Sequence, residues 1–167
     1  MRYRRAHWLA LTLTVIAALA SPGFSQSIVA GTAKNANGAL SVVRADGVET
    51  RLQGLGSLPV FEGDLLRVEG GGALIETAEG IQVALNGNAV VKILSRWDQG
   101  IGITRILRVQ RGEVWARSNG PRQPVEVETP VGVLAARAAE ISLRLASDDE
   151  AVATVVSGTA DFSTPFS

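Results

Sequence analysis

The stretch Ala73–Leu94, ALIETAEGIQVALNGNAVVKIL, carries the pattern from which the fold class of this 167-residue chain follows. Short apolar runs alternate in it with the turn residues Glu79-Gly80 and Asn86-Gly87-Asn88, where Gly and Asn tolerate the left-handed backbone of a tight turn. The runs are about five residues long and about nine residues apart, which is typical of a sandwich, a barrel or a solenoid. They are Ala73–Thr77, Ile81–Leu85 and Ala89–Leu94.

The same rhythm extends in both directions from this stretch. Ala39–Val43 and Val48–Leu52 flank Asp46-Gly47, which predicts an opening hairpin, and Gly63-Asp64 predicts a corner. Gly70-Gly71-Gly72 is interpreted as a break between strands, and no window of a dozen residues has helical periodicity free of Gly and Pro. Further strands are expected at 103–110, 113–117, 125–129, 131–136, 140–145 and 151–156. The predicted fold is all-β, either a short-stranded two-layer sandwich or a β-solenoid-like stack.

A faint internal repeat accompanies these strands. Residues 76–81 (ETAEGI) resemble residues 128–133 (ETPVGV), and Val91-Lys92-Ile93 resembles Leu143-Arg144-Leu145, in both cases at an offset of 52 residues. A repeat of this kind implies one β unit used twice, stacked so that each copy covers the apolar face of the other. We therefore expect a pseudo-repeat of about 52 residues.

Residues 1–26 have the features of a secretory signal peptide. Three arginines precede an uncharged run, Trp8–Ala20, that is shorter than the ~20 residues needed to span a bilayer. Small residues offer cleavage after Ala20 or after Ser25. An uncleaved anchor is the alternative. We expect export to the periplasm by the general secretory route, with no membrane span after cleavage.

The composition excludes several classes of protein. The chain has no Cys, and its single His, His7, lies in the predicted signal peptide, so no Cys-His or Ser-His-Asp arrangement and no histidine-ligated metal centre can form after cleavage. Three of the 16 Lys and Arg lie there as well, so residues 27–167 carry a net charge of about −3. A generally basic nucleic-acid binder is therefore excluded, and we expect no cofactor and no metal.

A set of motifs in the later part of the chain points to one family. The most specific stretch contains Gly112-Glu113-Val114-Trp115-Ala116, then residues 123–130 (QPVEVETP), and ends in Val155-Val156-Ser157-Gly158. Before it, Gly63-Asp64-Leu65-Leu66 follows a G-D-x-L pattern and residues 80–85 (GIQVAL) a G-x-x-[VA]-x-L pattern. The chain thereby resembles the FecR domain family over roughly residues 60–162.

The resemblance divides the chain and has one departure. We expect a signal peptide at 1–26, an N-terminal β-hairpin segment of the same domain at 27–58, a FecR-like β domain at 59–162 and a tail at 163–167. Family members usually carry Arg-Gly-Thr before Glu-Phe, whereas this chain has Arg137-Ala138-Ala139 before Glu140-Ile141. We therefore expect the turn that this Gly permits to be made differently here.

The resemblance implies a periplasmic, all-β module. The best-known relatives are iron-citrate sensors and anti-sigma regulators, which carry this domain outside the inner membrane and a sigma-binding segment inside. We expect no such segment here, and therefore no direct anti-sigma activity. The predicted function is a non-catalytic binding or scaffolding module in envelope signalling, with an envelope protein or an anionic envelope component as partner. A carbohydrate- or peptidoglycan-binding domain is the alternative, and a carboxylate-dependent glycosidase is a more remote one.

The carboxylates offer the only candidate chemistry. Glu62 with Asp64, and Glu126 with Glu128, stand two residues apart, so that on a strand each pair projects from one face, as a glycosidase or a calcium site requires. A solvated strand face explains the second pair as well, and Asp64 after Gly63 is expected to cap a turn. No catalytic residue is assigned.

Arginines are concentrated between residues 105 and 125, a segment that contains five arginines and one glutamate. Alternation along a strand puts Arg105 and Arg108 on opposite faces. The hypothesis is that Arg108, Arg117 and Arg122 form a basic patch that binds an acidic partner. Pairing of these arginines with acids on neighbouring strands is the alternative.

The two tryptophans outside the signal peptide receive different predictions. Trp97 lies in a polar turn and is a candidate contact residue, for a partner or for a sugar ring, and packing at the edge of the core is the alternative. Trp115 lies between Val114 and Ala116, and we expect it to fill space between the layers of the core.

Overall fold

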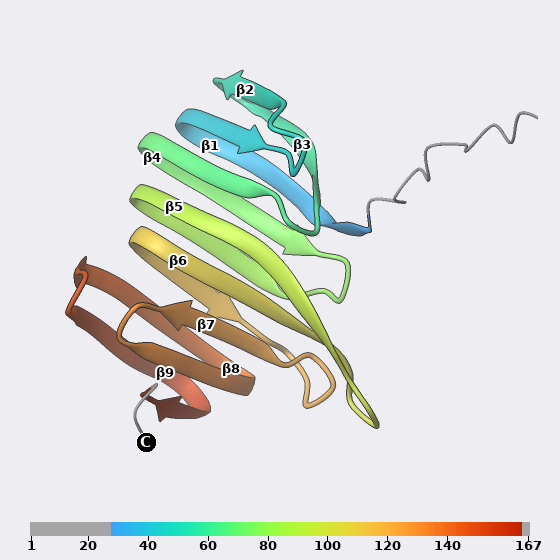
Figure 1. Cartoon of the computed structure of the whole chain (residues 1–167), viewed down its shortest axis with the longest axis vertical. Coiled ribbons are helices and arrows are strands. Elements are labelled where there is room, and N and C mark those ends of the chain that lie inside the picture. Colours follow the sequence, from blue (N-terminus) through green and yellow to red (C-terminus); the bar gives the residue numbers. More distant parts are fainter. Residues whose placement is uncertain (1–27, 165–167) are drawn as a thin grey trace, which may run out of the picture.

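The computed structural model describes residues 28–164 as one open β-sheet with both antiparallel and parallel neighbours. The described part contains no helix (Figure 1), which confirms the all-β class. The strands are β1 (Val29–Val43), β2 (Glu49–Gln53), β3 (Gly56–Phe61), β4 (Leu65–Thr77), β5 (Gln82–Asp98), β6 (Gly102–Arg117), β7 (Val125–Thr129), β8 (Gly132–Ser147) and β9 (Glu150–Ser163).

The predicted signal peptide, residues 1–26, lies outside the described residues, as do residues 165–167 of the predicted tail. Within residues 28–164, no helix is long and apolar enough to cross a membrane. The segment predicted at 27–58 contributes β1, β2 and part of β3 to the same sheet as the rest of the chain.

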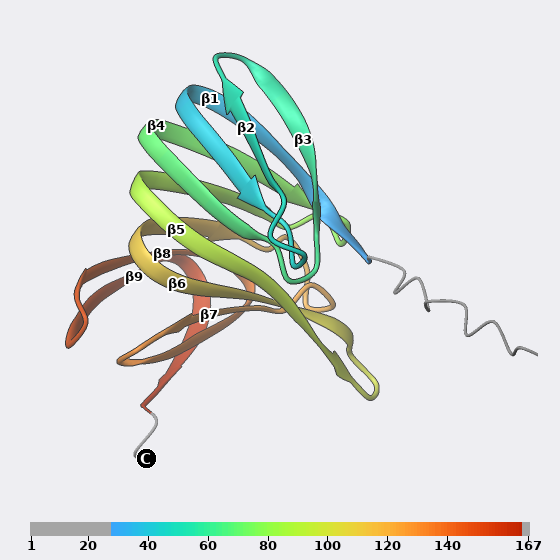
Figure 2. The same ribbon diagram turned by 45° about the horizontal axis from the view of Figure 1, so that its top comes forward.

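The sheet is folded over, so that single strands run through two layers. The strands follow the order β2-β1-β4-β5-β6-β7-β8-β9, and β3 pairs with the N-terminal half of β1. In β4, Leu65–Arg67 pair with Val90–Lys92 of β5 in what we call the first layer, which also holds β2 and β7. Gly72–Glu76 of β4 pair with Gln82–Asn86 of β5 in the second layer, which also holds β3. Figures 1 and 2 show the bend between the two halves.

Glycines in the left-handed region make the bends. Gly38 of β1, Gly70 of β4 and Gly112 of β6 have φ angles of 75°, 64° and 88°. A Cβ atom on Gly112 would lie 2.5 Å from the Cα atom of Ala89 on β5, so the neighbouring strands also need glycine for their close approach. The expectation that Gly70-Gly71-Gly72 separates two strands is wrong, because these residues bend β4 without ending it. Short predicted runs therefore merge into strands of up to 17 residues.

Asparagine side chains hold the bends together. The Oδ1 atom of Asn37 on β1 accepts a hydrogen bond of 2.8 Å from the backbone N–H of Gly72, and Oδ1 of Asn88 on β5 accepts one of 3.0 Å from that of Gly70. Backbone groups that leave the ladder at a bend thus find side-chain partners.

The core lies between the two layers. It includes side chains from both layers that are at most 1% exposed: Leu66 and Val91 of the first layer, and Ile75, Val83 and Leu85 of the second. The predicted hairpin and corner are confirmed. β1 pairs with β2 across the Asp46-Gly47 turn, and the chain turns at Gly63 between β3 and β4.

Trp115 corrects one expectation about the core. Its neighbours Val114 and Ala116 are 1% and 0% exposed and point into the core. Alternation therefore puts the indole on the outer face of the second layer, where it is half-buried. Its Nε1 donates a hydrogen bond of 3.1 Å to Oε1 of Glu140 on β8. The prediction that this ring fills space between the layers is wrong.

The bends of β6 and β8 lie at opposite ends of the sheet. Gly112, at the bend of β6, pairs with Leu145 near the end of β8, whereas the bend of β8 at Ala138 lies next to Ser118, just past the end of β6. In the first layer, β7 runs parallel to β6 and antiparallel to β8 and so fills the space between them. The strands β8 and β9 therefore fold over at the opposite end of the sheet from β6 (Figure 2).

Ala138 makes the bend of β8 with a φ angle of 48°, in the left-handed region that glycine prefers. Gly158 makes the matching bend of β9 with a φ of 78°. At the position of the usual Gly, Ala138 therefore makes the turn with a left-handed backbone in spite of its side chain.

Replacing Ala138 with glycine is expected to stabilise the protein by about 0.5–1 kcal/mol. A non-glycine residue pays roughly 1–2 kcal/mol in the left-handed region, and the added freedom of glycine in the unfolded chain cancels part of the gain. Urea unfolding followed by circular dichroism measures the difference. Ala135→Gly, in a regular part of β8, is the control and should destabilise the protein. A lower stability of Ala138→Gly would contradict the strain.

The predicted pseudo-repeat of 52 residues is not confirmed. Residues 76–81 and 128–133 both contain a turn in which a threonine hydroxyl binds the backbone, Thr77 to the N–H of Ile81 and Thr129 to that of Gly132. The first turn joins β4 to β5 in the second layer, and the second joins β7 to β8 in the first layer. The two similar stretches therefore form like turns in different layers.

Candidate interaction surface

The two edges of the sheet differ in how they are protected. One edge consists of the short strands β2 and β3, and Pro59 in β3 has no N–H to offer a further strand. The other edge is β9, which has 14 residues and contains neither Pro nor Lys. Within residues 28–164, β9 pairs with β8 alone, and both views place it at the end of the sheet opposite β2 and β3 (Figures 1 and 2). A long edge strand of this kind is open to pairing with another chain.

The core-facing side of β9 is uncovered. Val155 lies opposite Ile141 and Phe162 opposite Leu134, and both partners on β8 are buried. Residues opposite each other in an antiparallel pair point to the same face, so Val155 and Phe162 face the core side. They are nevertheless 44% and 50% exposed. Within residues 28–164, the hydrophobic core therefore ends at β9 without a covering element.

Charge on this edge has a single sign. Asp148, Asp149, Glu150 and Asp161 are exposed, and no Lys or Arg follows Arg144 in the sequence. None of these four acids takes part in an ion pair with another residue of the described range 28–164. The signal in the sequence was the acidic C-terminal part, but its position on a free edge follows only from the strand order.

The structure does not bring the three predicted arginines together. Arg108 is exposed on the outer face of the first layer, where its Nε donates a hydrogen bond of 2.7 Å to Oε2 of Glu128 on β7. Arg117 is exposed at the end of β6 in the second layer, opposite Gln82 of β5, and Arg122 lies in the loop before β7. The bend of β6 thus separates the first two. A partner-binding role for any of the three stays a prediction.

Arg105 is only 1% exposed. It lies on the opposite face of β6 from Arg108, as alternation predicted. Its Nη2 and Nε donate hydrogen bonds of 2.6 and 3.2 Å to the two carboxylate oxygens of Glu79, in the turn between β4 and β5. Gln123, from the loop before β7, donates a bond of 2.6 Å to the backbone carbonyl of Glu79. This ion pair ties the base of the β5–β6 hairpin to the second layer.

Trp97 is 74% exposed near the tip of the β5–β6 hairpin, opposite Ile103, which is 37% exposed. This exposure does not fit the alternative that Trp97 packs at the edge of the core, and its contact role stays a prediction. Figure 1 shows this hairpin projecting beyond the neighbouring strands.

Polar residues bind one another on the other face of the same hairpin. Arg96 donates hydrogen bonds to both carboxylate oxygens of Glu126, at 2.9 and 2.6 Å, and one to Asp98. The hydroxyl of Thr104 donates a bond of 2.6 Å to Asp98, and with Arg96 it holds the pKa of that carboxyl below its usual range. The bond to Glu126 raises the pKa of Arg96 further, so that it is always charged.

Comparison with protein families gives one result. The model of the family described as FecR protein matches residues 64–161, which is more than half of the chain. The chain belongs to the FecR family. No curated protein and no solved structure matches it. The predicted resemblance is thereby confirmed, and the matched region of the FecR domain runs from the start of β4 nearly to the end of β9.

Asp64, the acid of the G-D-x-L motif, has a structural role in this FecR domain. It is only 1% exposed, and its Oδ2 accepts a hydrogen bond of 2.8 Å from the backbone N–H of Phe61. The same oxygen forms an ion pair with Arg44, whose guanidinium lies 4.4 Å from the centre of the Phe61 ring. The expectation that Asp64 caps a turn is confirmed.

Two of the other candidate carboxylates are also engaged by arginines, whereas the side chain of Glu62 has no ion pair with another residue of the range 28–164. Glu126 binds Arg96 and Glu128 binds Arg108, which fits the alternative of paired charges on a solvated strand face. Among residues 28–164, no group of three His, Cys, Asp or Glu side chains is placed to hold a metal ion.

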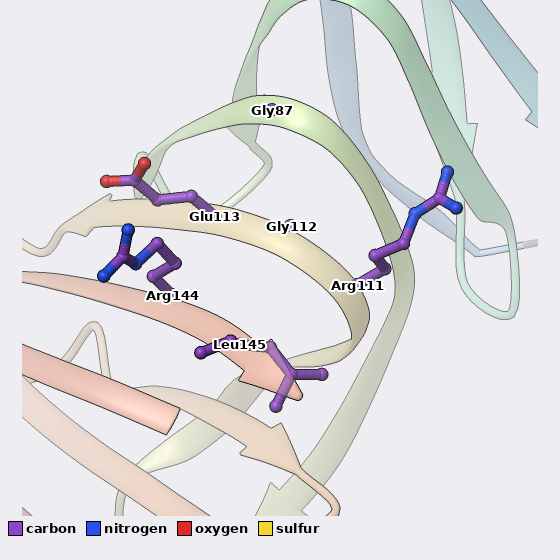
Figure 3. A pocket seen from close by; sticks show the side chains of 7 residues that line it. Gly87, Arg111, Gly112, Glu113, Arg144 and Leu145 are labelled. Carbon is purple, nitrogen blue, oxygen red and sulfur yellow. The ribbon is translucent and has the colours of Figure 1, made fainter. Parts of the chain in front are cut away.

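A surface depression of about 410 Å³ lies where the bend of β6 meets the end of β8. Figure 3 shows Glu113 and Arg144 on one side of it and Arg111 extending away on the other, with Leu145 between. Arg111 points away from Glu113 and Arg144, whereas a site that orients a small ligand needs polar groups that converge on it. The depression marks the place where the bends move from one end of the sheet to the other.

Proposed function

We propose that this FecR protein is a non-catalytic, periplasmic module that binds another protein and acts in envelope signalling. The observation that carries the proposal is the free edge at β9, a strand of 14 residues that pairs on one side only within residues 28–164. Backbone N–H and C=O groups along such an edge form hydrogen bonds with an added strand, and the added strand covers the open end of the core.

Family membership supports a regulatory role in the envelope, and the chemistry of the chain fits it. Outside the predicted signal peptide there is no His or Cys to act as a base or nucleophile. The candidate acids Asp64, Glu126 and Glu128 are each bound to an arginine, so none is a free partner for the two-carboxylate chemistry of a glycosidase.

The geometry favours protein binding over the alternative of glycan binding. A sugar site combines an aromatic ring with polar groups that converge on the sugar hydroxyls. Near Trp97, the polar groups Arg96, Asp98 and Thr104 bind one another on the other face of the hairpin. Trp115 lies in the second layer, with its N–H bound to Glu140. The polar groups near both described tryptophans are therefore already hydrogen-bonded within the protein and are not free to bind a sugar.

A complementation experiment tests the proposed function. In the source organism the gene is deleted, and the changes in envelope-related transcripts are recorded. Wild type, Val155→Lys and Val48→Lys are then supplied in trans. Val155 lies on the free edge and Val48, 57% exposed, precedes β2 at the other edge, so the two substitutions match in chemistry.

We expect Val155→Lys to leave the deletion phenotype in place and Val48→Lys to restore the wild-type pattern, because a charge on an edge strand blocks strand addition. Thermal unfolding of both purified variants checks that they fold. If Val155→Lys melts lower than wild type, Ala153→Lys, exposed on the same strand, replaces it. Full complementation by a folded edge variant overturns the proposed function.

A further inference from the structure

We infer that β9 takes up an extended segment rich in Lys and Arg from its protein partner, as an added strand of the sheet. This inference rests on the proposed function and specifies the chemistry of the partner. It follows from three properties of β9: the length of its free edge, the apolar groups that it leaves uncovered, and the sign of its charge.

The free edge offers two straight runs. β9 follows β8 from Glu150 to Ser157 and again from Thr159 to Ser163, with the bend at Gly158 between them. A typical strand has about 5–6 residues, so the run 150–157 alone is long enough to hold one. An added strand there extends the second layer.

An added strand brings side chains to the open end of the core. In the run 150–157, Ala151, Ala153 and Val155 lie opposite Leu145, Leu143 and Ile141 of β8 and face the core side. Every second side chain of the partner segment would pack beyond these residues. Small or branched apolar groups such as Val suit those positions, because the pleated surface favours them.

The charge of the edge selects against a second copy of this chain. Asp148, Asp149 and Glu150 lie at one end of the edge and Asp161 near the other, with no basic residue between them. Two copies paired through β9 would bring eight uncompensated acids to one interface, and like charges across strands are destabilising. Lysine and arginine on the partner segment instead gain from each of these acids and steer its approach.

Peptide binding to the purified protein, residues 27–167, tests the inference. The probe is a synthetic peptide as long as the run 150–157, with alternating valine and lysine. One comparison peptide has glutamate in place of every lysine. A second keeps the lysines but carries an N-methyl group on every backbone amide, so that neither of its edges can donate hydrogen bonds to a strand.

We expect the lysine peptide to bind, with an affinity that falls as salt is raised, and the other two peptides not to bind. The variant Asp149→Asn/Glu150→Gln should bind it about threefold more weakly, since each cross-strand charge pair contributes a few tenths of a kcal/mol. Asp46→Asn/Glu49→Gln, at the other edge, is the matched control and should bind like wild type. Amide hydrogen exchange should slow within 150–157 on binding.

Three results overturn the inference. Equal binding of the lysine and glutamate peptides, or unchanged binding by the acid-neutralised variant, means that charge does not select the partner. Equal binding of the N-methylated peptide means attraction without strand addition. A concentration-dependent dimer in sedimentation that Val155→Lys abolishes means that a second copy occupies the edge. Each of these leaves the complementation test of the proposed function independent, because that test reads signalling through the edge without regard to the partner's charge.

Discussion

Replacing Arg105 with methionine is expected to lower the free energy of unfolding by about 3–5 kcal/mol, because it leaves the carboxylate of Glu79 largely buried and without its cation. Arg105 is 1% exposed and donates two hydrogen bonds to Glu79, whose side chain is 15% exposed. Urea unfolding of the purified variant, followed by circular dichroism, measures the loss. The second expected result comes from the pair as a whole: Arg105→Met with Glu79→Leu should recover much of the stability, since an apolar pair of similar volume needs no ion partner.

Arg108→Met is the matched control for this prediction. It removes the same kind of side chain from the same strand, but the ion pair of Arg108 with Glu128 lies at the surface, with the arginine side chain 53% exposed. Exposed pairs contribute at most about 1 kcal/mol. If Arg105→Met is no more destabilising than Arg108→Met, the buried pair does not stabilise the fold.

Replacing Asp64 with alanine is expected to destabilise the protein by a similar amount, about 3–5 kcal/mol. The change removes the ion partner of Arg44 and the acceptor for the backbone N–H of Phe61 at the corner between β3 and β4. An unsatisfied buried donor by itself costs about 1–3 kcal/mol. The measurement is again urea unfolding, with the midpoint and the slope compared separately.

Glu62→Ala provides the control at the same corner. Glu62 is half-buried, and its side chain has no hydrogen bond or ion pair with any other residue in the described range, so its loss should change stability by about 0.5 kcal/mol or less. Equal effects of Asp64→Ala and Glu62→Ala would contradict the structural role of the motif acid.

Features set by neighbouring residues were predictable from the sequence. The hairpin at Asp46-Gly47 and the cap at Asp64 depend on local turn chemistry, and the opposite faces of Arg105 and Arg108 depend only on alternation. The family resemblance rested on motifs that the comparison confirms.

Features set by distant parts of the chain were not predictable in the same way. A glycine looks the same in sequence whether it ends a strand or bends one, so Gly70 and Gly112 did not reveal the fold-over of the sheet. Ala138 adopts a conformation that its side chain disfavours, because Arg137 and Glu140 on either side of it are held by β9. The partner of Arg105 lies 26 residues away.

The candidate site shows the same limit. The acids of β9 and its apolar residues are plain in the sequence, but a strand is an edge only with respect to all others. The order of the strands decides that β9 ends the sheet, and the bend of β6 decides that Arg108 and Arg117 lie apart.

The order of strands also bears on how the chain reaches this structure. β4 pairs with β5, β5 with β6, and β8 with β9, in each case with the next strand along the chain. Such contacts close short loops, so these hairpins can form one after another at a low entropic cost. Other pairings need longer loops: β1 pairs with β3 and β4, and β6 pairs with β8 and, in parallel, with β7. Folding is therefore expected to proceed through the adjacent hairpins first, with the pairing of β6 to β7 and β8 as the late step that joins the two parts of the sheet.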